Sequence, residues 1–116
     1  MKKILYVDDE SFNLEVFIDI FDGLFEIYTA DSGIEALSIL NKEPIDLVIT
    51  DMKMPNMSGL KLVEEIREKS IFIPCFILTG YELKREVRQA IDKGDLNGYF
   101  AKPFDTEEVL KTIKSF

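Results

Sequence analysis

Residues 46–55 read Asp-Leu-Val-Ile-Thr-Asp-Met-Lys-Met-Pro, and they contain both a strand signal and a candidate reactive group. From Leu47 to Thr50 the side chains are aliphatic or β-branched, without a charged residue. Short continuous runs of this kind are typical of strands that are buried on both faces of a parallel sheet. The run ends at Asp51, and a segment of helical periodicity begins at Gly59.

Similar runs lie on either side of this one. The expected strands cover residues 4–7, 25–30, 47–50, 74–79 and 98–101. Segments of helical period alternate with them, at residues 12–21, 32–40, 59–69, 82–93 and 105–113. Strict alternation of strands and helices predicts an α/β fold of the (βα)5 type, a doubly wound, five-stranded parallel sheet with right-handed crossovers.

Local signals mark several of the expected element ends. Ser32 and Glu35 have the spacing of a capping box, and Ile34 is expected on the apolar stripe of the helix that follows. Gly94 is expected to cap the end of the helix at 82–93, and Asp105 the start of the last helix.

Length and composition restrict the classes of function. The chain has 116 residues, which suits one domain covering residues 1–116, and its formal net charge of −8 disfavours nucleic-acid and anionic membrane partners. Because there is no histidine and only one cysteine, His-dependent triads, His-ligated zinc and internal disulfides are excluded. The apolar run at residues 4–7 is too short for a signal peptide or a membrane span, so we expect a cytoplasmic protein.

The ends of the expected strands carry most of the candidate chemistry. Ligands of doubly wound sheets bind outside the carboxyl ends of the strands. Those positions hold Asp8 and Asp9, Asp51, Thr79, and Lys102. The topology therefore brings three carboxylates, a hydroxyl and an ammonium group to one edge of the sheet.

Three neighbouring carboxylates repel one another, and a bound cation offsets this. At about 4 Å and an effective dielectric constant near 20, each pair costs on the order of 4 kcal/mol before screening. Mg²⁺ prefers oxygen ligands of this kind, and Mn²⁺ or Ca²⁺ could substitute for it. With the cation and Lys102 beside it, Asp51 would be a nucleophile toward a phosphoryl group and would form an aspartyl phosphate.

Other phosphate-binding α/β proteins fit less well. The chain has no GxGxxG and no GxxxxGK[ST] motif, and its first loop is acidic. A phosphohydrolase of the haloacid dehalogenase type would need a second acid two residues after the nucleophile, where this chain has Lys53.

Taken together, these motifs resemble the receiver domain of two-component response regulators over nearly the whole chain. The resemblance rests on four pieces in the expected order: Val7-Asp8-Asp9-Glu10, the run from Asp46 to Gly59, Leu78-Thr79-Gly80, and Tyr99-Phe100-Ala101-Lys102-Pro103-Phe104. It implies a flavodoxin-like sheet with strand order 2-1-3-4-5.

The resemblance also implies a role for each matching position of the acidic edge. Asp51 would be the phosphoacceptor, and Asp9 and Asp51 would bind Mg²⁺ directly. Asp8 would act on the metal mainly through water, and the backbone carbonyl of Lys53 would supply a further ligand.

Other matching positions would respond to phosphorylation. The Thr79 hydroxyl would move onto the phosphoryl group, Lys102 would pair with a phosphoryl oxygen, and the ring of Tyr99 would turn inward. Pro103 resembles the proline that follows a cis peptide, and Asn13 resembles a residue of receivers in hybrid kinases and cyclases.

The family's partners follow in the same way. A histidine kinase or histidine phosphotransfer protein would be the donor, and the domain would catalyse only its own phosphorylation and dephosphorylation. A downstream protein would bind the face formed by the helix at 82–93, the strand at 98–101 and the last helix. We expect a monomer or a phosphorylation-linked dimer, with no direct nucleic-acid contact, no membrane contact and no output domain within the chain.

Some positions depart from the family's usual pattern, and two other functions stay open. Lys53 and Tyr81 occupy positions that tune the phosphoryl lifetime, and we expect them to lengthen it. The segment 94–98 lacks the Gly-Ala pair common in the family. The alternatives are a phosphorylation-independent interaction module, which would usually lack an acidic or Lys position, and a small phosphohydrolase, which would need a separate general base.

Overall fold

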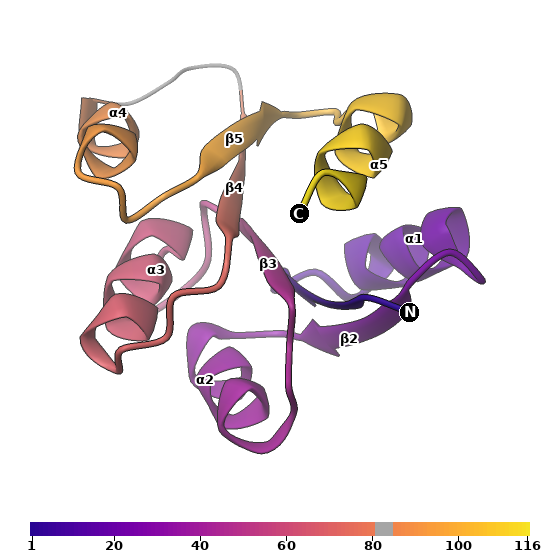
Figure 1. Ribbon diagram of the computed structural model, residues 1–116, viewed down its shortest axis with the longest axis horizontal. Coiled ribbons are helices and arrows are strands. Elements are labelled where there is room, and N and C mark those ends of the chain that lie inside the picture. The colour runs from indigo at the N-terminus through magenta and orange to yellow at the C-terminus, as the bar shows by residue number, and fades with distance from the viewer. Residues whose placement is uncertain (81–84) are drawn as a thin grey trace.

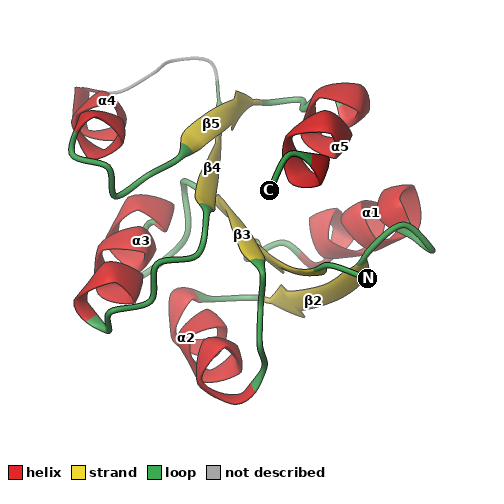
Figure 2. Cartoon of the chain, in the orientation of Figure 1, coloured by secondary structure: helices red, strands yellow, loops and turns green. Residues whose placement is uncertain are grey.

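The structure is a computed structural model that describes residues 1–80 and 85–116. Its centre is a sheet of five parallel strands in the order β2-β1-β3-β4-β5, which confirms the expected topology (Figures 1 and 2). The elements are β1 Lys3–Val7, α1 Ser11–Phe21, β2 Glu26–Ala30, α2 Gly33–Lys42, β3 Leu47–Asp51, α3 Gly59–Glu68, β4 Cys75–Thr79, α4 Arg85–Asp92, β5 Gly98–Ala101 and α5 Thr106–Lys114.

Helices cover both faces of the sheet, so each strand contributes to two cores. Figure 1 shows α1 and α5 on one side of the sheet and α2, α3 and α4 on the other. Within β1, Leu5 and Val7 join the core under α2, α3 and α4, whereas Ile4 and Tyr6 join the core under α1 and α5. Because successive strand residues point to opposite faces, burial on both sides requires the near-continuous apolar runs seen in the sequence.

The register of the parallel strands brings their carboxyl ends together. Val7 pairs with Thr50, and Asp51 pairs with Leu78, one residue before the end of β4. Thr79 pairs with Ala101, the residue before Lys102. The residues that follow each strand therefore meet at one edge of the sheet.

Most of the expected element ends are confirmed. The Ser32 hydroxyl accepts a hydrogen bond from the Glu35 amide at 3.1 Å, and Asp105 caps α5. Gly94 follows α4 with a positive φ of 85°, the left-handed conformation that favours glycine at a helix end. One expectation was wrong: Ile34 is exposed, because the helix buries Ala36 instead.

The atypical segment before β5 is tied to the neighbouring strand by a side chain. Asn97 donates its backbone N–H to the Cys75 carbonyl at 2.9 Å, and its side-chain oxygen accepts from the Cys75 amide at 3.0 Å. Leu96 beside it is fully buried in the core under α2, α3 and α4. The helix expected at 82–93 is described from Arg85 to Asp92, and residues 81–84 lie outside the described part.

Among the described residues, no helix has both the length and the apolar character needed to cross a bilayer.

Candidate functional site

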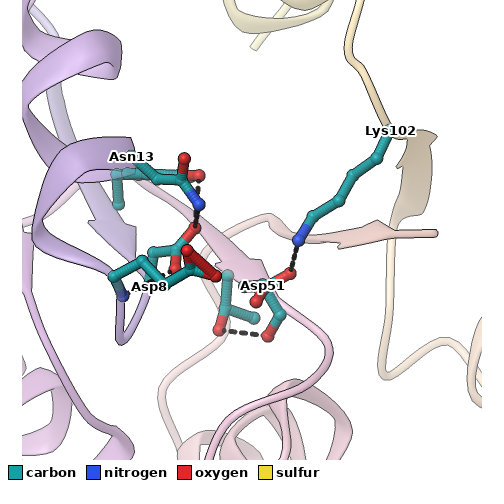
Figure 3. Close-up of polar contacts among 7 residues, drawn as sticks. Asp8, Asn13, Asp51 and Lys102 are labelled. Atoms are coloured by element: carbon teal, nitrogen blue, oxygen red, sulfur yellow. Dashed lines mark hydrogen bonds and ion pairs between the residues drawn. The ribbon is translucent and has the colours of Figure 1, made fainter.

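The carboxyl edge of the sheet carries the predicted site residues. Asp8 and Asp9 follow β1, Asp51 is the last residue of β3, and Lys102 follows β5. Figure 3 shows Asp8 and Asp51 as neighbours, with Asn13 approaching Asp8 from the side of α1 and Lys102 reaching Asp51 from the opposite side. Three separate segments of the chain, residues 8–13, Asp51 and Lys102, thus meet at this edge.

Asp51 is a nearly buried carboxylate with a direct cationic partner. Asp51 is 4% exposed, and its Oδ1 lies 2.5 Å from the Nζ of Lys102. Burial raises the pKa of Asp51 above its usual range and the Asp8 charge raises it further, while the Lys102 ammonium acts in the opposite direction. The side chain is therefore held beside a cation in a poorly solvated place, which suits a nucleophilic carboxylate.

Asp8 is fully buried, and within the described part of the chain its carboxylate accepts three hydrogen bonds. The Tyr6 hydroxyl donates to Oδ2 at 3.0 Å. The Asn13 amide donates to the same oxygen at 3.2 Å, as Figure 3 shows. The Glu10 backbone amide donates to Oδ1 at 3.0 Å. Burial and the Asp8 charge raise the pKa of Tyr6, so its hydroxyl stays protonated and remains a donor.

The three carboxylates fit a small, hard divalent cation. Asp8, Asp9 and Asp51 each present an oxygen, and these atoms all lie within 4.8 Å of one another. Octahedral Mg²⁺ with bonds of about 2.0–2.1 Å places its opposite ligands about 4 Å apart. The carboxylate oxygens would bind the ion directly after moving slightly closer together, or one carboxylate would bind it through a water molecule. The donor set is all oxygen, as Mg²⁺ requires.

The remaining predicted residues lie around this cluster. Thr79 ends β4 and is 6% exposed, whereas Tyr99 on β5 is 40% exposed. Lys53 lies in the connection between β3 and α3 with an exposed side chain, and the role of its carbonyl stays a prediction. The Lys102–Pro103 peptide is cis, as the resemblance implied. Tyr81 lies outside the described residues.

The backbone of Asp51 is packed closely by its own loop. The Thr50 hydroxyl donates to the Asp51 carbonyl at 3.0 Å, and the Gly59 amide donates to the Met52 carbonyl at 2.9 Å. A Cβ atom at Gly59 would lie 2.3 Å from the Asp51 carbonyl oxygen. Glycine is therefore required here by close approach, and it fixes where the strand carrying Asp51 meets α3.

A cavity of about 560 Å³ borders the site between α1 and the connection from β5 to α5. Its lining includes Asn13 and Lys102, together with the apolar side chains of Val16, Ile20 and Phe104. Asn13, which contacts Asp8, and Lys102, which contacts Asp51, are thus reached from a largely apolar opening.

Sequence reasoning missed Tyr6. It lies two residues before Asp8, and residues two apart in a strand point to the same face. That spacing is a usable signal, but Tyr6 also belongs to the apolar run at residues 4–7, which predicts only a buried strand. Its ring is indeed core, stacked on Phe17 with centroids 4.1 Å apart, while its hydroxyl belongs to the site.

Comparison with protein families gives one assignment for nearly the whole chain. Residues 4–114 match the model of the response regulator receiver domain. The sporulation initiation phosphotransferase F of Bacillus subtilis is 32% identical over 117 residues, which are 99% of this chain and 93% of that protein.

Longer relatives match through one part of their length. The sensor histidine kinase RcsC of Escherichia coli K12 is 32% identical over 111 residues, 95% of this chain. The chain spans only 12% of the length of that kinase.

Solved structures agree with the fold and the family. The Vibrio cholerae chemotaxis protein CheY4 superimposes with a TM-score of 0.88 at 33% identity, covering 99% of this chain and 98% of that one. A receiver domain protein from Clostridium thermocellum gives a TM-score of 0.85 at 35% identity, covering 99% and 93% of the two chains. With the acidic edge and its lysine in place, the chain belongs to the response regulator receiver domains, the phosphorylation-activated signalling modules of two-component systems.

Proposed function

We propose that this receiver domain accepts a phosphoryl group on Asp51 from the phosphohistidine of a separate histidine kinase or histidine phosphotransfer protein. The observation that supports it most strongly is the setting of Asp51, a nearly buried carboxylate paired with Lys102 and clustered with Asp8 and Asp9. Because residues 1–116 contain no histidine, the phosphohistidine must lie outside this domain.

In the proposed reaction, a carboxylate oxygen of Asp51 attacks the phosphorus opposite the bond to the donor imidazole. The new O–P bond forms while the P–N bond breaks, and its electron pair leaves with the imidazole nitrogen. Lys102 exchanges its contact with the carboxylate for a phosphoryl oxygen. Mg²⁺ would be held by Asp9, Asp51 and the Lys53 carbonyl, with Asp8 acting mainly through water, and would neutralise charge; Mn²⁺ or Ca²⁺ could substitute.

The phosphoryl group then acts as a local charge switch. It adds about −1.5 to −2 charges, which attract the Thr79 hydroxyl and the Lys102 ammonium. As Thr79 moves, the exposed ring of Tyr99 turns inward and the surface formed by α4, β5 and α5 changes shape. That surface would bind or release a downstream protein, or a second copy of the domain, in a cytoplasmic phosphorelay.

The decisive experiment uses small phosphodonors and mass spectrometry. The domain is incubated with Mg²⁺ and acetyl phosphate or phosphoramidate, and the expected product is a phosphoryl adduct that is stable in acid and labile in base. The adduct should be lost in Asp51→Asn and without divalent cation. Asp92→Asn is the matched control, because Asp92 is an exposed carboxylate on α4, and its adduct should be unchanged.

Other outcomes would support the two alternatives. No adduct under any of these conditions would indicate a phosphorylation-independent interaction module. Turnover of unrelated phosphomonoesters would indicate a phosphohydrolase. An adduct that persists in Asp51→Asn would contradict the assignment of the acceptor.

The lifetime of the adduct tests the role proposed for Lys53. Its side chain is exposed two residues beyond Asp51, where a cation can hinder or misorient attacking water. We expect Lys53→Ala to lose its phosphoryl group faster than the unaltered domain, with Lys61→Ala as an exposed lysine control on α3. Tyr81→Ala would test the partner position in the same assay, and unchanged or slower decay would contradict the hypothesis.

A further inference from the structure

The carboxylate of Asp8 is held from three sides by donors of the protein itself. Oδ2 accepts from the Tyr6 hydroxyl and the Asn13 amide, and Oδ1 accepts from the Glu10 backbone amide. Asp8 is fully buried, so no bulk water competes for these bonds. We refer to Tyr6, Asn13 and the Glu10 amide as the Asp8 clamp.

The clamp leaves the carboxylate with little capacity for a metal. An ionised carboxylate has about four acceptor positions, two on each oxygen. Tyr6 and Asn13 use both positions on Oδ2, and Glu10 uses one on Oδ1. The donors of residues 1–80 and 85–116 thus leave one acceptor position on Oδ1 for an ion or for a water bound to it.

The clamp is also rigid. The Tyr6 ring is buried in β1 and stacks on Phe17 of α1, with the ring planes only 6° apart. Asn13 lies in the first turn of the same helix. Because the packing of α1 on β1 fixes both donors, Asp8 cannot rotate to offer two oxygens to an ion without breaking buried hydrogen bonds.

Ions differ in what they need from such a carboxylate. Ca²⁺ takes six to eight oxygen ligands at 2.3–2.6 Å and often uses both oxygens of one carboxylate. Mg²⁺ keeps octahedral geometry, retains several waters and uses one or two carboxylates singly. A carboxylate limited to one acceptor position therefore serves Mg²⁺ and serves Ca²⁺ poorly.

We propose that Tyr6 and Asn13 are specificity-determining residues that restrict Asp8 to a single oxygen contact and so make this site prefer Mg²⁺ over Ca²⁺. They act through Asp8 and are positioning residues rather than metal ligands. The inference rests on the proposed function in one respect, that the acidic edge binds a divalent cation.

The test measures ion selectivity, which a purely structural role would leave unchanged. Dissociation constants for Mg²⁺ and Ca²⁺ are measured by titration calorimetry for the unaltered domain, Tyr6→Phe, Asn13→Ala and the double variant. Removal of a group that orients a metal ligand changes affinity by about tenfold or more. We expect the ratio of the Ca²⁺ to the Mg²⁺ dissociation constant to fall roughly tenfold in each single variant and further in the double variant.

Tyr28→Phe is the matched control. The Tyr28 hydroxyl also donates to a carboxylate, that of Glu26 at 2.7 Å, but it lies on β2 away from the site. Its selectivity ratio should equal that of the unaltered domain. If Tyr6→Phe fails to fold, Asn13→Ala alone decides, since Asn13 is only half-buried on α1.

The outcomes separate this inference from the proposed function. Unchanged ratios in Tyr6→Phe and Asn13→Ala, with Mg²⁺ binding and Asp51 phosphorylation intact, would overturn the proposed role of the Asp8 clamp. The proposed function would not be affected. An unaltered domain that binds neither ion, measured by the same calorimetry, would overturn both. If the ratio of the Ca²⁺ to the Mg²⁺ dissociation constant fell equally in Tyr28→Phe, the proposed role of the Asp8 clamp would also be wrong.

Discussion

Gly59 shows how a single residue positions the reactive strand. Its amide bonds the Met52 carbonyl, and a Cβ there would collide with the Asp51 carbonyl oxygen at 2.3 Å. That neighbour is backbone and cannot rotate away. We expect Gly59→Ala to lower the free energy of unfolding by about 1–3 kcal/mol, the usual cost of overpacking, and to slow phosphorylation of Asp51. Urea unfolding and the small-donor assay measure the two effects.

Gly33→Ala is the matched control for this change. Gly33 is also the first residue of a helix after a capping serine, and there the Cβ would meet the Met57 Sδ at 2.3 Å. The end of a methionine side chain can move aside, and alanine favours the helix by about 0.5–1 kcal/mol. Gly33→Ala should therefore cost less than Gly59→Ala. An equal loss in both variants would contradict the role given to Gly59.

Cys75 gives the protein a pH dependence in the alkaline range. Burial raises the pKa of its thiol from 9.0 to about 11, with Arg67 acting in the opposite direction. The raised pKa means that the neutral thiol is favoured in the folded state. Its contribution is therefore complete below about pH 9 and is lost as the pH rises toward about 11, by at most about 3 kcal/mol.

The measurement compares slopes rather than absolute stabilities. Between pH 9 and 11, the free energy of unfolding should fall more steeply for the unaltered domain than for Cys75→Ala. All other ionisable groups are the same in both proteins, so their effects cancel in the difference. Parallel curves would show that the thiol ionises equally in the folded and unfolded states.

Among the elements, Arg67 joins three segments at the amino ends of the strands, the edge of the sheet opposite the site. From the end of α3, its guanidinium donates to the carbonyls of Ile71 and Ile73 before β4, at 2.9 and 2.8 Å. It also donates to the Asp95 carbonyl between α4 and β5 at 2.8 Å. Asn97 extends the junction by its paired hydrogen bonds to Cys75. These bonds hold the connection into β5, and so the position of Tyr99.

We expect Arg67→Met, which keeps the apolar stem, to lower the free energy of unfolding by about 2–3 kcal/mol. The reason is that three carbonyls lose a charged donor in a half-buried place. Lys61→Met on the same helix is the control, because its ion pairs with Glu64 and Glu65 are exposed and worth under about 1 kcal/mol. Both are measured by urea unfolding, and equal losses would exclude a special role for the junction.

At the scale of the whole molecule, the net charge of −8 is concentrated in part at one edge of the sheet. Folding brings Asp8, Asp9 and Asp51 together, and their mutual repulsion opposes the folded state. A cation that binds only the folded protein stabilises it, by about 2.7 kcal/mol at a concentration one hundred times its dissociation constant. We therefore expect Mg²⁺ to raise the melting temperature by several degrees.

Two comparisons distinguish stabilisation by Mg²⁺ bound at the site from stabilisation by general screening of charge. The same ionic strength supplied as NaCl should raise the melting temperature less than MgCl₂ does. Asp51→Asn should melt higher than the unaltered domain without Mg²⁺, because one charge is gone, and should lose most of the Mg²⁺ response. A full Mg²⁺ response in Asp51→Asn would place the binding site elsewhere.

The fold and the acidic edge could be predicted because their signals are local. The apolar run from Leu47 to Thr50 marks a doubly buried strand, and every strand of a parallel sheet ends at the same edge. The residues that follow those strands can therefore be grouped from the amino-acid sequence. The cap at Asp105 also follows from a short stretch of sequence, and the expected strand bounds agree with the structure to within one residue. The cis peptide before Pro103 was implied by the family resemblance.

The (βα)5 order, the sheet and the acidic edge that holds Asp8, Asp51 and Lys102 can thus be predicted from the amino-acid sequence. The donors that hold Asp8 and the carbonyls that Arg67 binds are known only from the folded chain. These contacts depend on how residues of different elements are oriented toward one another after packing. A tyrosine hydroxyl and an asparagine amide meet one carboxylate oxygen only after α1 packs on β1, and a period of two or of 3.6 residues does not encode that meeting.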